Sequence, residues 1–224
     1  MMTDKQLPNS TIAGAGTISG GKYNAVRCSG SVKITDNIEC HSFSASGSAS
    51  AVGKIECEGL LETSGAMRVA GDVQADTVKC SGALRISGVT EARKIMASGA
   101  FKAEKDVSAE FVDISGGITV DGLFNAEYID IRLGGDSRVG SIGGGTITVK
   151  RGQCVSFFGF FKKRYPILKT SVIEADSVDL EDTVAETVRV INAKIRSGCE
   201  IGTLEYSGNL EVDPNAKIGN IVKR

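Results

Sequence analysis

The chain has 224 residues and a net charge of −1 at pH 7, so its global charge gives no reason to expect nucleic acid as a partner. Hydrophobic residues make up 41% of the sequence, but aromatic residues only 5%, and tryptophan is absent. A core of Val, Ile, Leu and Ala is therefore expected. The 28 glycines, against three prolines, are typical of many short strands with tight corners rather than of disorder.

Residues 1–11 are predicted to form a short flexible N-terminus. Their sequence, MMTDKQLPNST, lacks the basic and apolar regions of a secretory signal. No apolar run approaches the ~20 residues that a membrane-spanning helix needs. A cytoplasmic protein is therefore expected, in which the six cysteines stay thiols.

Residues 12–149 are predicted to form a regular block, because they repeat a unit centred on a Ser-Gly pair. The spacings between successive pairs are 17, 18, 17, 17 and 17. A second glycine follows at a fixed distance in most units, as at Gly53, Gly71 and Gly88. The pairs are Ser29-Gly30, Ser46-Gly47, Ser64-Gly65, Ser81-Gly82, Ser98-Gly99 and Ser115-Gly116.

Between the glycines, apolar residues alternate with polar ones, as at Leu84 and Ile86, and a period of two indicates strand. One unit cannot bury its own apolar side, whereas stacked units can. The pattern predicts an all-β fold: a single-stranded β-helix (solenoid) with rungs of about 17 residues. Propeller repeats of ~40 residues are too long to fit, and a repeat of 17 rather than 18 favours a right-handed coil.

The cysteines and the histidine also follow the repeat. Cys40 and Cys57 are one repeat apart in a column that is alanine in other units, and Cys28 and Cys80 precede the Ser-Gly pair. These four are predicted to pack in the core. His41 stands where other units carry acidic residues, so it is expected on the surface without the partner or cleft that acid–base catalysis requires.

No motif points to a reaction. The string GTISGGK at residues 16–22 lacks the Ser or Thr that follows the lysine of a phosphate-binding loop, and no CxxC pair suggests zinc. The acidic residues are interpreted as a solvated face rather than as paired catalytic carboxylates. We therefore predict no catalytic residue, no cofactor and no metal, and that the protein is not an enzyme. These acidic residues are Asp72, Asp76, Glu110, Asp121 and Glu127.

Residues 150–169 break the repeat and are predicted to form an aromatic and basic insertion or cap. Half of the phenylalanines fall within five residues, and three cations follow at once. The segment could enter a membrane surface with its rings and meet anionic head groups with its cations, dock a protein partner, or cap a solenoid end. The predicted contact residues are Phe157, Phe158, Phe160, Phe161, Lys162, Lys163, Arg164 and Tyr165.

Residues 170–224 are predicted to be degenerate C-terminal rungs. The string Ile201-Gly-Thr-Leu204 recurs one repeat later as Ile218-Gly-Asn-Ile221. The end rungs of a solenoid present unpaired backbone groups to another chain. Lys223 and Arg224 are expected to blunt the C-terminal edge, which favours pairing through the N-terminal edge; pairing through that edge alone would give dimers rather than filaments. The predicted self-association residues are Ile12, Ile18, Ile218 and Ile221.

Five strings, taken in their order along the chain, carry a family resemblance. They are Cys80-Ser-Gly-Ala-Leu-Arg-Ile86, Phe124-Asn-Ala-Glu-Tyr-Ile-Asp-Ile131, Ser156-Phe-Phe-Gly-Phe-Phe161, Leu168-Lys-Thr-Ser-Val-Ile-Glu-Ala175 and Gly198-Cys-Glu-Ile-Gly-Thr-Leu-Glu-Tyr206. Together they resemble the bactofilin family, polymer-forming bacterial cytoskeletal proteins, and more closely its longer members in Bacillus-like bacteria.

The resemblance implies a right-handed, roughly triangular β-helix that assembles end to end without nucleotide. It also implies scaffolding at the inner face of the cell membrane, in cell shape, envelope growth or motility. This chain departs from the family pattern in having a longer body and an apolar-basic segment that is internal rather than N-terminal.

Three hypotheses of function follow. The first is a non-enzymatic structural protein that self-associates through its β-helix ends into a nucleotide-independent polymer and scaffolds unidentified client proteins near the cytoplasmic membrane. The second is a membrane-associated adaptor that does not polymerise and docks partners through residues 155–168. The third is a β-helical enzyme of acyltransferase type or one that acts on polysaccharides, which the absence of a catalytic constellation disfavours.

Overall fold

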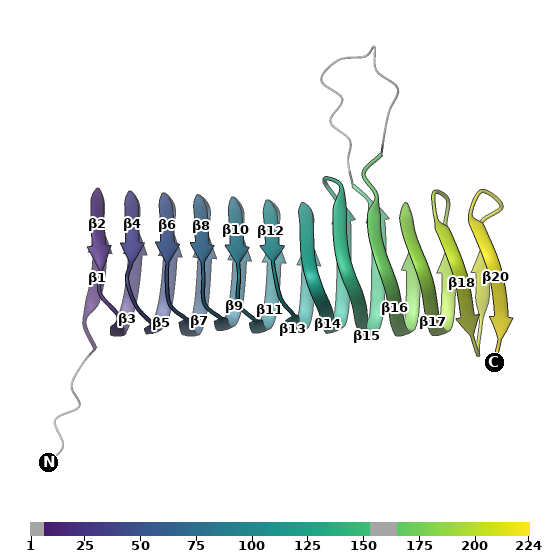
Figure 1. Ribbon diagram of the computed structural model, residues 1–224, viewed down its shortest axis with the longest axis horizontal. Coiled ribbons are helices and arrows are strands. Elements are labelled where there is room, and N and C mark those ends of the chain that lie inside the picture. The colour runs from purple at the N-terminus through teal and green to yellow at the C-terminus, as the bar shows by residue number, and fades with distance from the viewer. Residues whose placement is uncertain (1–6, 153–164) are drawn as a thin grey trace, which may run out of the picture. The chain divides into compact units, whose positions relative to one another are not determined.

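The computed structural model describes residues 7–152 and 165–224, and all regular structure in these ranges is β-strand (Figure 1). Backbone contacts divide the chain into two units, residues 1–105 and residues 106–224. Each unit is a β-solenoid of parallel strands, which confirms the all-β fold predicted from the repeat.

In unit 1, after the first strand, strands of four residues alternate with strands of eight or nine. Each strand pairs in parallel with the strand after next, so that β1 pairs with β3 and β2 with β4. The partners are one repeat apart along the chain, as in Gly21↔Ile38 and Ser48↔Ala66. The strands are β1 Asn9–Ile12, β2 Ala15–Ile18, β3 Gly21–Cys28, β4 Ser31–Ile34, β5 Ile38–Ala45, β6 Ser48–Ala51, β7 Ile55–Thr63, β8 Ala66–Val69, β9 Val73–Cys80, β10 Ala83–Ile86, β11 Thr90–Ala97 and β12 Ala100–Ala103.

The Ser-Gly pairs form the corner between each long strand and the short strand that follows. A Cβ atom on Gly82 would lie 2.0 Å from the carbonyl oxygen of Gly65 in the rung before, and Gly65 meets Gly47 in the same way. That carbonyl of Gly65 accepts a hydrogen bond from the backbone N–H of Ala83, at 2.9 Å. Glycine is needed at this corner because the stacked backbones approach too closely for any side chain.

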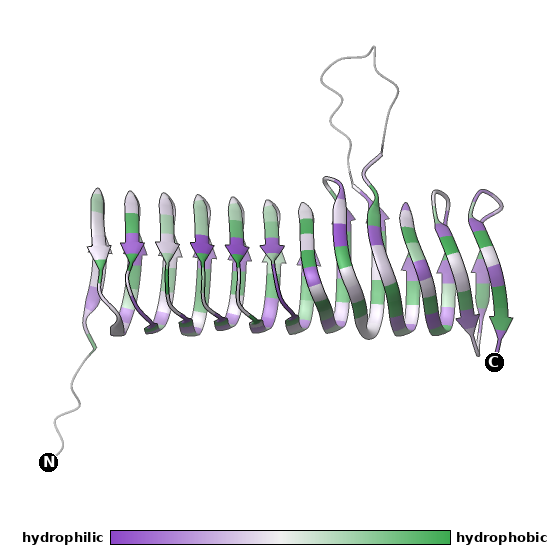
Figure 2. Cartoon of the chain, in the orientation of Figure 1, coloured by the Kyte–Doolittle hydropathy of each residue, from purple (hydrophilic) through white to green (hydrophobic). Residues whose placement is uncertain are grey.

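The core of unit 1 is a set of inward ladders of small and branched side chains. Figure 2 shows hydrophobic and hydrophilic residues alternating along the strands, as a period of two requires. Cys40 and Cys57 are paired in register, and both are buried, as are Cys28 and Cys80. This confirms their prediction as core residues. One complete ladder, buried throughout, consists of Ile18, Ile34, Ala51, Val69, Ile86 and Ala103.

Unit 2 has longer strands and less uniform rungs. Its paired residues are 17 apart at Val107↔Phe124, 31 apart at Ser137↔Leu168 and 15 apart at Leu168↔Thr183. The rung between Ser137 and Leu168 contains the insertion. The strands are β13 Val107–Ile114, β14 Gly117–Leu133, β15 Ser137–Arg151, β16 Leu168–Leu180, β17 Thr183–Ile195, β18 Glu200–Tyr206, β19 Leu210–Val212 and β20 Lys217–Lys223.

The strand bounds refine the segments expected from the sequence. β1 begins at Asn9, within the stretch predicted to be a flexible N-terminus. β15 reaches Arg151 and β16 begins at Leu168, so both strands overlap the segment 150–169 that was predicted as an insertion.

Ion pairs link rungs of unit 2, as between Arg196 and Asp179. Exposed pairs of this kind contribute about 0–1 kcal/mol each to stability.

Candidate functional site

The residues predicted to contact a membrane or partner lie mostly outside the described residues. Tyr165 is described and is half-buried. What the structure does show is how the solenoid holds the two ends of this segment. The predicted residues outside the described ranges are Phe157, Phe158, Phe160, Phe161, Lys162, Lys163 and Arg164.

A bidentate ion pair joins the rungs on either side of the insertion. The Nε of Arg151, at the end of β15, donates to Oδ2 of Asp182 at 2.6 Å, and its second guanidinium nitrogen donates to Oδ1 at 2.9 Å. The side chain of Asp182 is only 7% exposed. Its hydrogen bonds and charge raise the pKa of Arg151 above the ordinary value, so the guanidinium stays charged at any accessible pH.

Two further contacts complete this clamp, which we define as Arg151, Tyr165, Glu181 and Asp182. The guanidinium carbon of Arg151 lies 3.8 Å from the centroid of the Tyr165 ring, a cation–π geometry. The backbone N–H of Arg151 donates to a carboxylate oxygen of Glu181 at 2.9 Å. Arg151 is therefore tied to Tyr165, the first described residue after residues 153–164, and to Glu181 and Asp182 in the next rung.

The local backbone explains why the clamp forms at this corner. Asp182 has φ of 47° and Gly198, one rung later, has φ of 77°, a left-handed region that favours glycine. A Cβ atom on Gly198 would lie 2.0 Å from Oδ1 of Asp182. The glycine thus leaves room for the buried carboxylate that Arg151 neutralises.

The insertion leaves the stacking of the rungs intact. The N–H of Ser137 donates to the carbonyl of Ile167, and the N–H of Leu168 donates to the carbonyl of Asp182, at 2.9 and 3.0 Å. The chain therefore leaves and re-enters the solenoid at one corner. The clamp holds the two described ends of the insertion against the solenoid.

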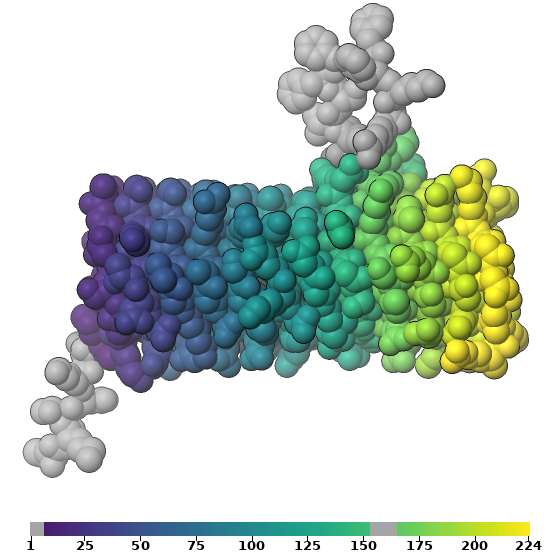
Figure 3. Space-filling view, in the orientation of Figure 1, coloured from purple at the N-terminus to yellow at the C-terminus, as the bar shows by residue number. Residues whose placement is uncertain are grey.

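The C-terminal rung exposes residues that continue the core. Ile221 pairs in register with Leu204, which is fully buried, but Ile221 itself is 49% exposed. Val212 pairs with buried Ile195 and is 40% exposed. Ile218 is half-buried. In Figure 3 the C-terminal strands, in yellow, lie at one end of unit 2.

The two basic residues at this rung fold back on the chain. Arg224 forms an ion pair with Glu205 in the rung before, at 2.5 Å, and the Lys223 ammonium lies 5.8 Å from the centroid of the Tyr206 ring. Among the described strands, β20 pairs with β18 alone. The outer backbone edge of β20 is thus open to another strand in the described structure.

The first rung covers its core better. Ile18 is buried at 3% exposure, and Ile12 is half-buried with its side chain over Gly16, where a Cβ atom would lie 3.0 Å from it. The hydroxyl of Tyr23 donates to the carbonyl of Ser19 at 2.9 Å. The predicted self-association residues therefore differ: Ile221 is open, Ile12 and Ile218 are half-buried, and Ile18 is covered.

His41, the residue tested for acid–base catalysis, lines a small surface pocket of about 240 Å³ with Glu39, Glu56 and Glu58, so the expectation that it has neither a partner nor a cleft is wrong. His41 is exposed, and its Nδ1 lies 3.6 Å from a carboxylate oxygen of Glu58, which confirms its expected surface position. Burial raises the pKa of Cys80 and of Cys199 to about 11 each, so both are thiols at neutral pH. The described residues contain no cluster of three or more potential metal ligands, and they contain no helix that could span a membrane.

Two features of unit 2 escaped the sequence reasoning. The first is the clamp, which was not predicted although Arg151 stands directly beside the insertion. The second is a pair of stacked aromatic rings, Phe111 and Tyr128, whose centroids are 5.3 Å apart with an interplanar angle of 5°. The two residues are one repeat apart in the sequence, and that spacing is the signal that could have shown the pair.

Comparison with known proteins gives two relatives from Bacillus subtilis (strain 168). The uncharacterized protein YhbF is 45% identical over 82 residues, which span 37% of this chain and 33% of YhbF. The uncharacterized protein YhbE is 40% identical over 58 residues, 26% of this chain and 24% of YhbE. The chain thus spans a third of the first relative and a quarter of the second. No protein-family model matches the chain, and no solved structure matches it.

Proposed function

We propose that this chain is a non-enzymatic structural protein, which self-associates through the ends of its β-solenoid without nucleotide and scaffolds other proteins near the cytoplasmic membrane. The observation that carries the proposal is the C-terminal rung, where two core ladders end in exposed residues: Ile221, 49% exposed, and Val212, 40% exposed. The resemblance of the rungs to bactofilins supports the same role, because that family forms polymers.

The physical argument rests on the edge of β20. An unpaired parallel edge offers N–H and C=O groups at the spacing that a further rung needs. Each new backbone hydrogen bond contributes roughly 1 kcal/mol net, and covering the exposed half of a branched side chain adds roughly 1 kcal/mol. Arg224 is paired with Glu205 on the preceding rung, so part of the positive charge at this edge is already neutralised before a second chain stacks on it.

Electron microscopy of the purified 224-residue chain without nucleotide tests the proposal. We expect filaments or bundles from the wild type and none from Ile221→Lys, because the lysine places a charge in the stacking surface. Val52→Lys changes another exposed apolar residue, at a corner of unit 1, and should leave filaments unchanged. Dispersed single particles from the wild type at high concentration would refute self-association.

The second candidate function is an adaptor that presents the insertion to a membrane or a partner without polymerising. The clamp favours it, since the bidentate pair of Arg151 and Asp182 anchors the base of the segment. Flotation with anionic liposomes should be lost when Phe157, Phe158, Phe160 and Phe161 are changed to Ser. Equal flotation of both proteins would exclude a membrane contact by this segment.

A further inference from the structure

A surface groove crosses the rungs of unit 2. It has a volume of about 980 Å³ and crosses β15, β16, β17, β18 and β20. In each of these strands one residue is skipped by the ladder, as between the pairs Lys169↔Val184 and Thr170↔Ala185 and the next pair Val172↔Thr187. The skipped residues form the floor of the groove. They are Gly140, Ser171, Glu186, Gly202 and Gly219.

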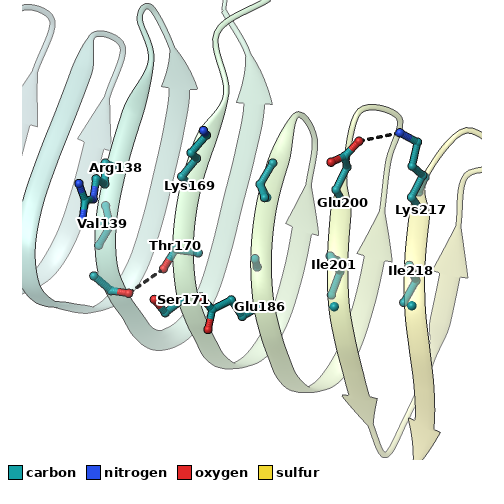
Figure 4. A pocket seen from close by; sticks show the side chains of 16 residues that line it. Arg138, Val139, Lys169, Thr170, Ser171, Glu186, Glu200, Ile201, Lys217 and Ile218 are labelled. Atoms are coloured by element: carbon teal, nitrogen blue, oxygen red, sulfur yellow. Dashed lines mark hydrogen bonds and ion pairs between the residues drawn. The ribbon is translucent and has the colours of Figure 1, made fainter.

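The small floor residues bring backbone to the surface. A Cβ atom on Gly202 would lie 2.6 Å from the carbonyl oxygen of Glu186, and one on Gly219 would lie 2.8 Å from that of Gly202. The Thr170 hydroxyl donates to the carbonyl of Gly140 at 3.3 Å and ties two rungs together there (Figure 4). The groove is therefore a built feature of stacked bends.

One wall of the groove carries a row of in-register side chains with charges in a definite order. The row is Arg138, Lys169, Val184, Glu200 and Lys217. Figure 4 shows Glu200 and Lys217 joined by an ion pair, 2.7 Å between Nζ and Oε1. At the other end two cations are direct neighbours.

Three charges of the groove have no ion-pair partner among the described residues: Arg138, Lys169 and Glu186. Other unit 2 cations, such as Arg189 and Lys194, have carboxylates on neighbouring rungs. Like charges on directly opposed strand positions are destabilising, so Arg138 beside Lys169 does not serve the fold. A ligand that brings anions to this end would relieve the repulsion.

We propose that this groove binds an extended peptide segment of a partner protein. The segment places acidic side chains against Arg138 and Lys169, an apolar side chain over Val184, and a basic side chain toward Glu186. Rungs are ~4.8 Å apart, so Arg138 and Glu186 are about 10 Å apart along the groove. Extended chain rises ~3.3 Å per residue, which puts the first acidic and the basic residue of the segment about three positions apart.

The charge order favours a peptide over a membrane or a polyanion. A flat anionic bilayer cannot enter a groove floored by backbone, and its head groups would meet Glu186 and Glu200. A uniform polyanion would meet the same two carboxylates. A peptide can change sign along its length, as the groove does. This inference deepens the proposed function, on which it rests for the idea that the protein has clients, by naming the kind of client segment.

The test is an array of synthetic hexapeptides in which each position is acidic, basic or apolar, probed with the full 224-residue chain. We expect selection of peptides with two acidic residues and a basic residue on their far side, with affinity about tenfold above charge-scrambled peptides. The double variant Arg138→Glu with Lys169→Glu should reverse that preference toward basic pairs. A reversal requires a folded groove, so loss of folding cannot imitate it.

The matched control is Lys33→Glu with Arg68→Glu, the same charge change at two exposed positions of unit 1, which should keep the wild-type preference. Absence of any charge preference, or a preference unchanged in the Arg138/Lys169 variant, would overturn the proposal. The proposal would also be overturned if the wild type bound phosphatidylglycerol vesicles but no peptide, and the Arg138/Lys169 variant lost the vesicle binding. Filament formation is measured separately by electron microscopy. A wild type that selects peptides but forms no filaments would refute the proposed self-association and would support peptide binding in the groove.

Discussion

Unit 1 and unit 2 are both stacks of parallel rungs, but they turn their corners differently. In unit 1 the corners are stacked glycines such as Gly65 and Gly82, where backbone lies on backbone, and paired positions keep a nearly constant spacing. In unit 2 the strands β14, β15, β16 and β17 run unbroken for 13 to 17 residues, and the spacing of paired positions varies from rung to rung. The uniform unit presents repeated polar faces, whereas the irregular unit contains the clamp, the groove and the exposed core residues.

This difference indicates that binding features in a solenoid form where the repeat is irregular. A rung that must fit identical neighbours on both sides has little freedom, because each side chain is set by the ladder it joins. Where the repeat is broken, side chains such as Arg151 and Asp182 are free to take positions that no ladder dictates. If this comparison holds, substitutions at the glycine corners of unit 1 should lower stability strongly. Substitutions in the irregular features of unit 2 should lower it more than matched changes elsewhere on the surface.

The largest effect is expected at the glycine corners of unit 1. Gly82→Ala puts a methyl group 2.0 Å from the Gly65 carbonyl oxygen, and such overpacking should lower the free energy of unfolding by about 3 kcal/mol. Gly14 begins the same column but has no heavy atom within 4 Å of its would-be Cβ. Gly14→Ala should therefore change stability by less than about 0.5 kcal/mol. Urea unfolding measures both, and equal losses would show that the stacked corner is not the constraint.

The clamp should give the next largest effect. Arg151→Met leaves the Asp182 carboxylate, 7% exposed, without its cation, and should cost about 2 kcal/mol of stability. Arg132→Met removes an exposed arginine that pairs with Asp130 at 3.1 Å, and should cost less than about 0.5 kcal/mol. Thermal unfolding of the two variants compares them directly. If both lose the same small amount, the base of the insertion is not specially anchored.

A pH-dependent effect is expected at Asp179. Hydrogen bonds from Arg196 lower the pKa of its carboxyl below the ordinary value, so the pair contributes stability above the unfolded pKa of about 3.9 and loses it as pH falls through the folded pKa. Because the Arg196 side chain is 40% exposed, the contribution is expected to be about 0.5–1 kcal/mol. Asp179→Asn should lower stability at pH 7, and the difference in stability from wild type should shrink as the pH falls below the unfolded pKa of Asp179. A gap that is constant with pH would contradict the ion pair.

The smallest effect is expected from the ring pair of unit 2. Phe111 and Tyr128 stack 5.3 Å apart on the surface, and a double-mutant cycle with Phe111→Ser and Tyr128→Ser should give a coupling of about 0.5 kcal/mol. A coupling of zero would mean that the two rings do not stack in solution.

Much of the fold could be predicted because a solenoid repeats its constraints. The Ser-Gly spacing marks the corners, and the columns that contain Cys40, Cys57 and Cys80 mark the core, because inward ladders accept only small or apolar residues. The handedness of the coil stays a prediction. The assignment of the repeat also placed His41 outside, where it is observed.

The irregular features could not be predicted, since their partners depend on the insertion rather than on the repeat. Arg151 and Asp182 are 31 residues apart, so a period of 17 does not bring them together. The repeated string Ile201-Gly-Thr-Leu204 and Ile218-Gly-Asn-Ile221 marked two floor residues of the groove, Gly202 and Gly219. The rungs before them have Ser171 and Glu186 at the same place, so the groove as a whole was not predicted. The engagement of Arg224 by Glu205 also required the structure, because the sequence suggested a blunted C-terminal edge.

The central claim is that the exposed core at the last rung holds chains together. Sedimentation velocity of the wild type, Ile221→Lys and Val52→Lys over a concentration series tests it most directly. We expect large, concentration-dependent species for the wild type and Val52→Lys, and a folded monomer for Ile221→Lys. A monomeric wild type at every concentration, or an Ile221→Lys variant that assembles as well as the wild type, would contradict it.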